Sequence, residues 1–269
     1  MKVLLVSRID DHGALQFTGS FADTLMARGH TIWFEESTAR KLGQEGVSPE
    51  DVCPDVAVVV GGDGSVLRTV QQLSRQVPLL GINWGEVGFL TACEPEEALS
   101  FFTVPEQFGI ETRMRISLVM DGDPLGSALN EALIFTSQPS KMLRFAISID
   151  GSVTERFRAD GLLVSTPTGS TAYAMSAGGP IVDPRIEGFL LVPLAPYMLS
   201  SRPHLVDTAR TVEIALESDK PANIVLDGQK TCRIKKSSRI QIRKAEEPAY
   251  FVDLGKNFFE RVDHKLRRL

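Results

Sequence analysis

The feature that most constrains the fold is a short apolar run that ends in a glycine turn. Val56–Val60 ("VAVVV") is apolar at every position, which is typical of a central strand in a parallel sheet covered on both faces. The turn "GGDG" at 61–64 follows, and Val66, Val70 and Leu73 then recur at helical spacing. A strand, a glycine turn and a helix in this order predict one unit of a doubly wound α/β sheet.

The same alternation extends over residues 1–112. Helical spacing of Phe17, Phe21 and Leu25 ends at Gly29, where a helix cap is expected. Further strands are predicted in "KVLLVS", "HTIWFE" and "PLLGIN", and a helix in "EPEEALSFF". We therefore expect residues 1–112 to form a Rossmann-like α/β domain.

The pattern changes at Arg113, where short strand-like runs separated by turns begin. Asp150-Gly151 between two such runs predicts a hairpin. Residues 113–249 are expected to form a β-rich, β-sandwich-like domain. The tail, 250–269, contains a predicted helix and can pack back on the first domain. Its basic residues are interpreted as a solvated helix end, with a binding role as the less favoured alternative.

Composition narrows the class of protein. Of 269 residues, 43% are hydrophobic, which is enough for a substantial core. A formal net charge of −5 argues against a nucleic-acid binder, and no apolar stretch is long enough to predict a membrane span. Three scattered cysteines (Cys53, Cys93, Cys232) without metal-ligand spacing fit a reducing compartment. We expect a cytoplasmic protein with no nucleic-acid or membrane partner.

The glycine turn is expected to hold an anion. Glycines permit positive φ and close approach to a ligand, and the free N–H groups near Gly64 and Ser65 attract negative charge. The turn lacks both the Lys-Ser/Thr of a P-loop and the G-x-G-x-x-G spacing of a dinucleotide fingerprint. Asp63 in its middle has three explanations: a helix cap, a Mg²⁺ ligand, or a base that takes a proton from an attacking hydroxyl.

The most unusual stretch is the loop at 157–181, "FRADGLLVSTPTGSTAYAMSAGGPI". It is rich in turn-forming residues, so local structure alone explains its composition. Its hydroxyls also suit a polar ligand, with Gly169 allowing close approach and Tyr173 able to stack on a base. The hydroxyl-bearing residues are Ser165, Thr166, Thr168, Ser170 and Thr171. Nucleotide binding and simple turn formation both remain open at this point.

Five blocks, in this order along the chain, resemble the NAD kinase family. They are "GGDGSVLR" (61–68), "GINWGEVGFLT" (81–91), "NEALI" (130–134), the loop at 157–181 and "DGQ" (227–229). A lone GGDG also occurs in lipid kinases and some phosphofructokinases, whereas the combination is specific. Trp84 departs from the commonest family pattern, in which a basic or other polar residue is frequent.

The resemblance implies phosphorylation of the adenosine ribose 2′-hydroxyl of NAD, which gives NADP. ATP or inorganic polyphosphate would be the donor, and Mg²⁺ or another divalent cation the cofactor. No residue of the chain is assigned as a metal ligand. A homodimer or homotetramer is expected.

Site residues follow from the matching motifs. Asp63 would be the base or the group that orients the hydroxyl, and Gly62 and Gly64 would shape the phosphate loop. Asn130 and Glu131 would hold a ribose diol. Arg68 either faces the phosphates or is a surface residue of the helix.

The remaining predicted contacts concern the two ends of the dinucleotide. Phe89 would pack near the adenine, and Asp160, with Arg158 two residues before it, would contact the other half. Thr168, Thr171, Ala172 and Tyr173 would line the adenine pocket. Ala195 and Gln229 are further candidate contacts.

Two alternative functions are weighed. A lipid kinase of the diacylglycerol kinase class would share the GGDG turn but lack the hydroxyl-rich loop. A non-catalytic pyridine-nucleotide-binding regulator would be expected to have lost Asp63 or the glycines, and all of them are present.

Overall fold

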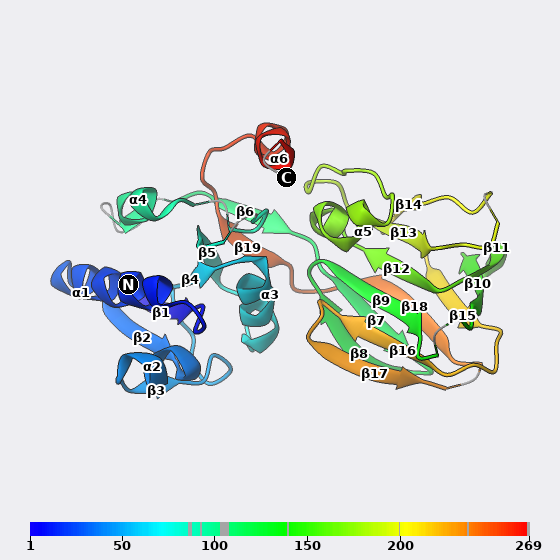
Figure 1. Ribbon diagram of the computed structural model, residues 1–269, viewed down its shortest axis with the longest axis horizontal. Helices are drawn as coiled ribbons and strands as arrows, with labels where there is room; N and C mark the ends of the chain where they lie inside the picture. Colours follow the sequence, from blue (N-terminus) through cyan, green and yellow to red (C-terminus); the bar gives the residue numbers. More distant parts are fainter. Residues whose placement is uncertain are drawn as a thin grey trace. The chain divides into compact units, whose positions relative to one another are not determined.

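The computed structural model describes residues 1–85, 88–91, 93–102, 108–138, 140–198, 200–235 and 237–267. Glu86 and Val87, within the motif at 81–91, lie outside the described residues. The chain divides into two compact units (Figure 1). The first is formed by Met1–Thr112 together with Ala249–Leu269, and the second by Arg113–Pro248.

The first unit is built on a seven-stranded sheet in the order β3-β2-β1-β4-β5-β19-β6. From β3 to β19 every neighbouring pair is parallel, as the apolar run Val56–Val60 predicts. The strands are β1 (Lys2–Ser7), β2 (Thr31–Glu35), β3 (Gly46–Val47), β4 (Val56–Gly61), β5 (Pro78–Asn83), β6 (Ile110–Arg113) and β19 (Ala249–Val252). The C-terminal part of the chain thus extends the first sheet, with β19 beside β5.

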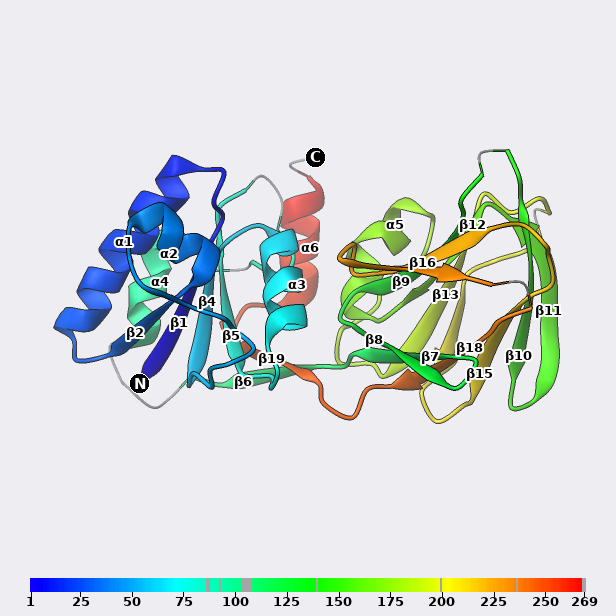
Figure 2. The same cartoon turned by 90° about the horizontal axis from the view of Figure 1, so that it is seen from below.

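Helices cover both faces of this sheet, which confirms the doubly wound class (Figure 2). α1 (His12–Ala27) and α2 (Glu36–Leu42) lie on one face and α3 (Asp63–Gln72) on the other, and α6 (Phe258–Leu266) follows β19 at the end of the chain. The helix expected near residue 95 is shorter than predicted, with α4 (Pro95–Ala98) passing into a 3-10 turn (Leu99–Phe102). In the described ranges, no helix is long and apolar enough to cross a membrane.

Local sequence sets the limits of α1. Asp11 accepts a hydrogen bond from the Ala14 nitrogen at 2.9 Å, so its side chain caps the first turn. Gly29 follows the last turn with φ of 84°, a left-handed conformation that glycine adopts without steric cost. Phe21 and Leu25 on the inner face are buried against the sheet.

The second unit consists of two six-stranded antiparallel sheets, in the orders β11-β10-β15-β18-β7-β8 and β14-β13-β12-β9-β16-β17. The first sheet contains β7 (Ile116–Met120), β8 (Asp123–Ala128), β10 (Leu143–Ile149), β11 (Ser152–Ala159), β15 (Val212–Leu216) and β18 (Arg239–Lys244). The second contains β9 (Glu131–Thr136), β12 (Gly161–Ser165), β13 (Gly188–Leu194), β14 (His204–Asp207), β16 (Ala222–Leu226) and β17 (Lys230–Ile234). The predicted β-sandwich is thus confirmed.

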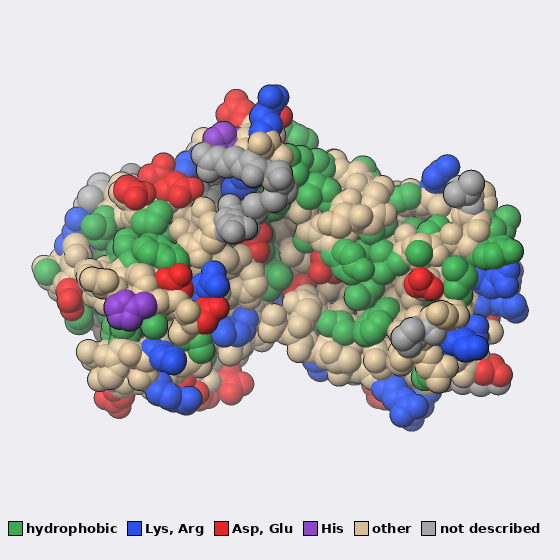
Figure 3. Space-filling view, in the orientation of Figure 1, with side chains coloured by type: hydrophobic (Ala, Val, Ile, Leu, Met, Phe, Trp, Pro, Cys, Tyr) green, Lys and Arg blue, Asp and Glu red, His purple; other side chains and the backbone are tan. Residues whose placement is uncertain are grey.

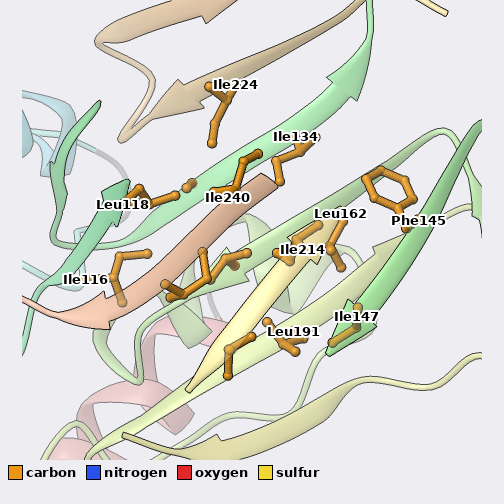
Figure 4. Close-up of a cluster of buried hydrophobic side chains, with 14 of the residues drawn as sticks. Ile116, Leu118, Ile134, Phe145, Ile147, Leu162, Leu191, Ile214, Ile224 and Ile240 are labelled. Carbon is orange, nitrogen blue, oxygen red and sulfur yellow. The ribbon is translucent and has the colours of Figure 1, made fainter. Parts of the chain in front are cut away.

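One apolar cluster joins the two sheets of this unit (Figure 4). Ile116, Phe145 and Ile214 come from one sheet, and Ile134 and Leu162 from the other. The predicted hairpin at Asp150-Gly151 joins β10 to β11, with φ of 51° and 79° at its two residues. A 3-10 turn (Thr168–Thr171) and the short helix α5 (Tyr173–Ser176) interrupt the strands within the hydroxyl-rich loop.

Candidate functional site

Asp63 lies at the start of α3, just beyond the carboxyl end of β4. Its Oδ2 accepts a hydrogen bond from the Phe89 nitrogen at 2.8 Å. Its Oδ1 accepts from the nitrogens of Leu90 at 2.9 Å and Thr91 at 3.2 Å. The N-cap of α3 is Gly62, with no side-chain cap. The helix-cap explanation of Asp63 is therefore wrong, because the carboxylate instead holds the segment 89–91 against the turn.

The two carboxylate oxygens of Asp63 are not equally engaged. Oδ1 has a further contact with the Thr91 hydroxyl at 3.4 Å, so among the described residues it has three donors, whereas Oδ2 has one. A carboxylate oxygen has room for about two hydrogen bonds. Oδ2 therefore keeps an open acceptor direction, and it is the atom of this side chain that can receive a proton from a ligand.

The glycines of the turn act differently from the prediction. None of Gly61, Gly62 and Gly64 has a positive φ, so the expectation of left-handed backbone is wrong. A Cβ at Gly61 would lie 2.6 Å from the Ser65 hydroxyl, so packing within the protein requires this glycine. A Cβ at Gly62 or Gly64 would meet nothing within 4 Å. Internal packing does not require glycine at these two positions, and the open space beside them can admit a ligand.

The backbone at the start of α3 is partly engaged within the turn. The Ser65 nitrogen donates to the Gly62 carbonyl at 2.9 Å, so the prediction that this N–H is free is wrong. Gly88 shows the closest packing, since a Cβ there would overlap the Thr91 hydroxyl and lie 3.1 Å from Asp63 Oδ1. The turn and the segment 88–91 therefore form one packed structure around the carboxylate.

Two half-buried cations of the first unit belong to this neighbourhood. Arg68 Nε and Lys265 Nζ are buried and have no hydrogen-bond partner among the described residues. Lys265 Nζ lies 5.5 Å from the centre of the Phe89 ring. Burial lowers the pKa of Lys265, and the charge of Asp63 opposes this shift. The interpretation of the tail as a solvated basic helix end is wrong for Lys265, and Arg68 is not a simple surface residue.

Trp84 has a structural role at the carboxyl end of β5. Its Nε1 donates to Asp11 Oδ1 at 3.1 Å, and its ring centre lies 5.3 Å from that of Phe17. It also lines a cavity of about 910 Å³ with Arg8, Asn83, Glu94 and others. The tryptophan therefore ties β5 to the cap of α1.

In the second unit, Asp227 organises the segment that carries Asn130 and Glu131. Its Oδ2 accepts from the Leu129 nitrogen at 2.7 Å. Its Oδ1 accepts from the nitrogens of Asn130 at 2.8 Å and Glu131 at 3.1 Å. Sequence reasoning selected Gln229 from the "DGQ" motif, but Gln229 is exposed and Asp227 makes these contacts. The sequence feature that could have identified Asp227 is the Asp-Gly pair of a hairpin turn, in which Asp227 has φ of 47°.

Asn130 and Glu131 present unused acceptors. Asn130 Oδ1 and Glu131 Oε2 are buried and have no hydrogen-bond partner among the residues that the structure describes. Burial, with the nearby charge of Asp227, raises the pKa of Glu131 to about 7. Buried polar atoms nearly always have partners, so two adjacent unpaired acceptors indicate a ligand that brings hydroxyl donors.

Most hydroxyls of the loop hold the loop itself together. Four of the five donate to backbone carbonyls: Ser165 to Asn130 at 3.1 Å, Thr166 to Leu129 at 2.6 Å, Ser170 to Pro167 at 2.7 Å and Thr171 to Thr168 at 3.3 Å. Thr168 Oγ1 is buried without a hydrogen-bond partner among the described residues. Local structure therefore accounts for four of these hydroxyls, and among the described residues Thr168 is the one of the five whose hydroxyl has no partner.

Gly169 also serves internal packing. A Cβ at this position would overlap the backbone carbonyl of Asn130. The close approach predicted for Gly169 is therefore to the protein's own backbone, and it fixes the loop against the start of β9.

A second group of predicted residues meets at a cavity of about 580 Å³ in this unit. Asp160, Tyr173 and Ala195 line it, with Leu133, Phe135 and others. Tyr173 is 47% exposed, which leaves its ring available, and hydrophobic side chains gather on this face beside α5 (Figure 3). Arg158 is not among the described lining residues, and its guanidinium lies 4.2 Å from the centre of the Tyr197 ring.

Comparisons with known proteins agree over the whole chain. Residues 3–103 match the model of the ATP-NAD kinase N-terminal domain, and residues 129–254 match that of the ATP-NAD kinase C-terminal domain. NAD kinases from Methanoculleus marisnigri and Methanoregula boonei are 62% and 59% identical, and each alignment covers 100% of both chains.

Solved structures agree with these matches. The crystal structure of an NAD kinase from Archaeoglobus fulgidus in complex with ATP is 33% identical, with a TM-score of 0.84 and 100% of both chains covered. Yeast NADH kinase complexed with NADH is 23% identical, with a TM-score of 0.90 over 99% of this chain and 87% of that one, and supports the fold. Both neighbours are kinases of pyridine dinucleotides. The chain belongs to the NAD kinase family.

Proposed function

We propose that the chain transfers the γ-phosphoryl group of ATP to the 2′-hydroxyl of the adenosine ribose of NAD, which gives NADP and ADP. As a member of the NAD kinase family, the chain is an enzyme that phosphorylates NAD. The observation that carries the proposed mechanism is the open acceptor direction of Asp63 Oδ2 beside two glycines with free space around them.

Asp63 acts as the base in this mechanism. The 2′-hydroxyl donates its proton to Oδ2 as its oxygen forms a bond to the γ-phosphorus, and the bond from that phosphorus to the β–γ bridging oxygen breaks. The three backbone N–H groups of residues 89–91 fix the carboxylate in position. General-base help of this kind is typically worth about 10² to 10⁴ in rate.

Asn130 and Glu131 bind a ribose diol of the dinucleotide. Two vicinal hydroxyls supply the two donors that Asn130 Oδ1 and Glu131 Oε2 lack. Thr168 Oγ1 adds a third group that can bond the nucleotide. Asp160, Tyr173 and Ala195 share one cavity, where a planar ring can stack on Tyr173.

A divalent cation fits this site only as a companion of the donor. The described residues contain no cluster of three or more metal-ligating side chains. Mg²⁺ usually keeps several waters and is held in large part by substrate phosphates, so it would enter with the donor, and Asp63 keeps the role of base. When bound, the ion spreads the negative charge that develops on the phosphoryl oxygens. Inorganic polyphosphate would present linked phosphate groups like those of ATP, so we also propose it as a phosphoryl donor.

Location and assembly complete the proposal. A cytoplasmic enzyme is supported by free thiols at Cys53, Cys93 and Cys232, which suit a reducing compartment. A homodimer or homotetramer is the expected assembly for this family.

An assay of NADP formation tests the proposal. Purified protein is incubated with NAD, Mg²⁺ and either ATP or polyphosphate. The NADP formed is measured with an NADP-specific dehydrogenase, which uses it as the oxidised coenzyme. NADP that accumulates in proportion to ADP supports the proposed reaction. The absence of NADP with both donors would contradict it and favour a regulator that binds pyridine nucleotides without catalysis.

A further inference from the structure

The C-terminal helix α6 turns one lysine inward. Asn257 caps the helix through hydrogen bonds from the nitrogens of Phe259 at 2.9 Å and Glu260 at 3.3 Å. Val262 is buried, and Lys265, three residues further along, lies on the same face. The sequence therefore sets this helix so that Lys265 faces the interior of the first unit.

The surroundings of Lys265 combine burial with the reacting carboxylate. Its Nζ is buried and lies 5.5 Å from the centre of the Phe89 ring. The backbone nitrogen of the same Phe89 donates to Asp63 Oδ2. The charges of Asp63 and Glu94 attract the ammonium, and those of Arg261 and Lys256 repel it.

Two other cations of the tail have ion-pair partners, whereas Lys265 has none among the described residues. Lys256 pairs with Glu97 at 2.6 Å, and Arg267 pairs with Asp263 at 2.8 Å. In the part of the chain that the structure describes, no acceptor bonds Lys265 Nζ, so three N–H donors are buried unused. A buried ammonium without hydrogen bonds is costly, and a ring face compensates only part of that cost. An anionic ligand with several oxygens would supply what is missing.

We propose that Lys265 binds oxygens of the donor's transferred phosphoryl group, so that α6 supplies a cation to the phosphoryl site formed at the GGDG turn. The inference rests on the proposed kinase function and adds a residue outside the recognised motifs. Lys265 acts by charge and by donating hydrogen bonds. The proton of the ribose hydroxyl goes to Asp63, and the bond to the leaving phosphate breaks as already described.

The test compares Lys265→Met with Arg267→Met in the full-length protein. Methionine keeps the length of the buried stem and removes the charge, and Arg267 is an exposed cation of the same helix. Calorimetry measures the Kd of Mg²⁺-ATP, of inorganic tripolyphosphate and of NAD, and kinetics separate KM for ATP from kcat. Thermal unfolding gives the Tm of each variant. Lys265→Gln is measured in parallel in case the methionine variant does not fold.

Lys265→Met is expected to weaken binding of ATP and tripolyphosphate by about tenfold or more, the usual scale for a charge-assisted hydrogen bond. Lys265→Met should also lower kcat, and it should leave the Kd of NAD unchanged. Its Tm should stay equal or rise, because an unpaired buried charge is removed. Lys265→Arg should restore part of the activity, and Arg267→Met should match the wild type throughout.

Two results would overturn the assignment. One is wild-type donor binding and turnover in both Lys265→Met and Lys265→Gln. The other is a lowered Tm with unchanged affinity for ATP and tripolyphosphate, which would give Lys265 a structural role. Failure of the proposed function looks different, because the wild type would then make no NADP even though tripolyphosphate binding still depended on Lys265.

Discussion

The carboxylate of Asp227 accepts a hydrogen bond from the backbone nitrogen of Glu131 at 3.1 Å, and its charge helps to raise the pKa of the Glu131 side chain. Asp227 therefore has two effects on one residue. It fixes the backbone that carries Glu131, and it adds to burial in favouring the neutral form of the Glu131 carboxyl group. The first effect holds Asn130 and Glu131 in place, and the second makes stability depend on pH.

Glu131→Gln should stabilise the protein at high pH. The pKa of Glu131 is raised from 4.5 to about 7 in the folded protein. Below pH 4.5 the group is neutral in both states, and as pH rises towards 7 only the unfolded state ionises, so stability falls. Above pH 7 the loss is constant, on the order of 3 kcal/mol. Urea unfolding should show a large gain for Glu131→Gln at pH 8 and a much smaller one at pH 5. Equal gains at both values would contradict the assigned cause.

Two threonines of the hydroxyl-rich loop make a matched pair. Thr166 donates to the Leu129 carbonyl at 2.6 Å and accepts from the Gly169 nitrogen at 3.0 Å, whereas Thr168 Oγ1 has no hydrogen-bond partner among the described residues. Thr166→Val should therefore lower the free energy of unfolding by about 1–3 kcal/mol. Thr168→Val should leave stability nearly unchanged and raise KM for NAD. A Thr168→Val variant that unfolds earlier and binds NAD normally would instead give the Thr168 hydroxyl a structural role.

Gly61 and Gly64 should respond in opposite ways to alanine. A Cβ at Gly61 would lie 2.6 Å from the Ser65 hydroxyl, so Gly61→Ala should lower the Tm. Gly64 lies within α3 with no atom within 4 Å of a Cβ, so Gly64→Ala should raise stability by about 0.5–1 kcal/mol. In the proposed mechanism a phosphate approaches this position, so the same variant should lose most of its NADP formation. A Gly64→Ala enzyme that is stable and fully active would show that no ligand comes close to this position.

Trp84→Phe tests whether the unusual tryptophan is structural. Phenylalanine keeps a ring against Phe17 but cannot donate to Asp11, which also caps α1. The Tm should fall, corresponding to about 0.5–1.5 kcal/mol for one lost hydrogen bond, with KM for NAD and ATP unchanged. A change in either KM without loss of stability would instead place Trp84 at a substrate.

Much of the fold was predictable because the decisive signals are local. The apolar run Val56–Val60 predicts a central parallel strand, and Asp150-Gly151 predicts a hairpin. The helix α2 was missed because it is only seven residues long and its limits depend on the Glu35 side chain and on Gly43 in a left-handed conformation. The pairing of β19 with β5 was also out of reach, because it joins segments about 170 residues apart in the sequence.

In the candidate site, the sequence identified residues that matter more reliably than it identified the groups that they contact. Asp63 was selected from its place in a glycine turn, but its hydrogen-bond donors lie 26–28 residues further along the chain. The hydroxyls of the loop looked alike in sequence, and only the structure shows that Thr168 alone among the five is unpaired within the described residues. Lys265 was interpreted as solvated because the direction in which a short amphipathic helix faces depends on what it packs against.

The most direct test of the central claim is the turnover of Asp63→Asn at saturating NAD and ATP, measured with the Kd of both ligands. The amide keeps the size of the side chain but cannot take a proton, and it presents N–H where an acceptor for the Phe89 nitrogen is needed. If Asp63 is the base, kcat should fall by about 10² to 10⁴ while both ligands still bind. Turnover near the wild-type rate would contradict this account, and loss of binding together with turnover would mean that Asp63 acts only by holding residues 89–91.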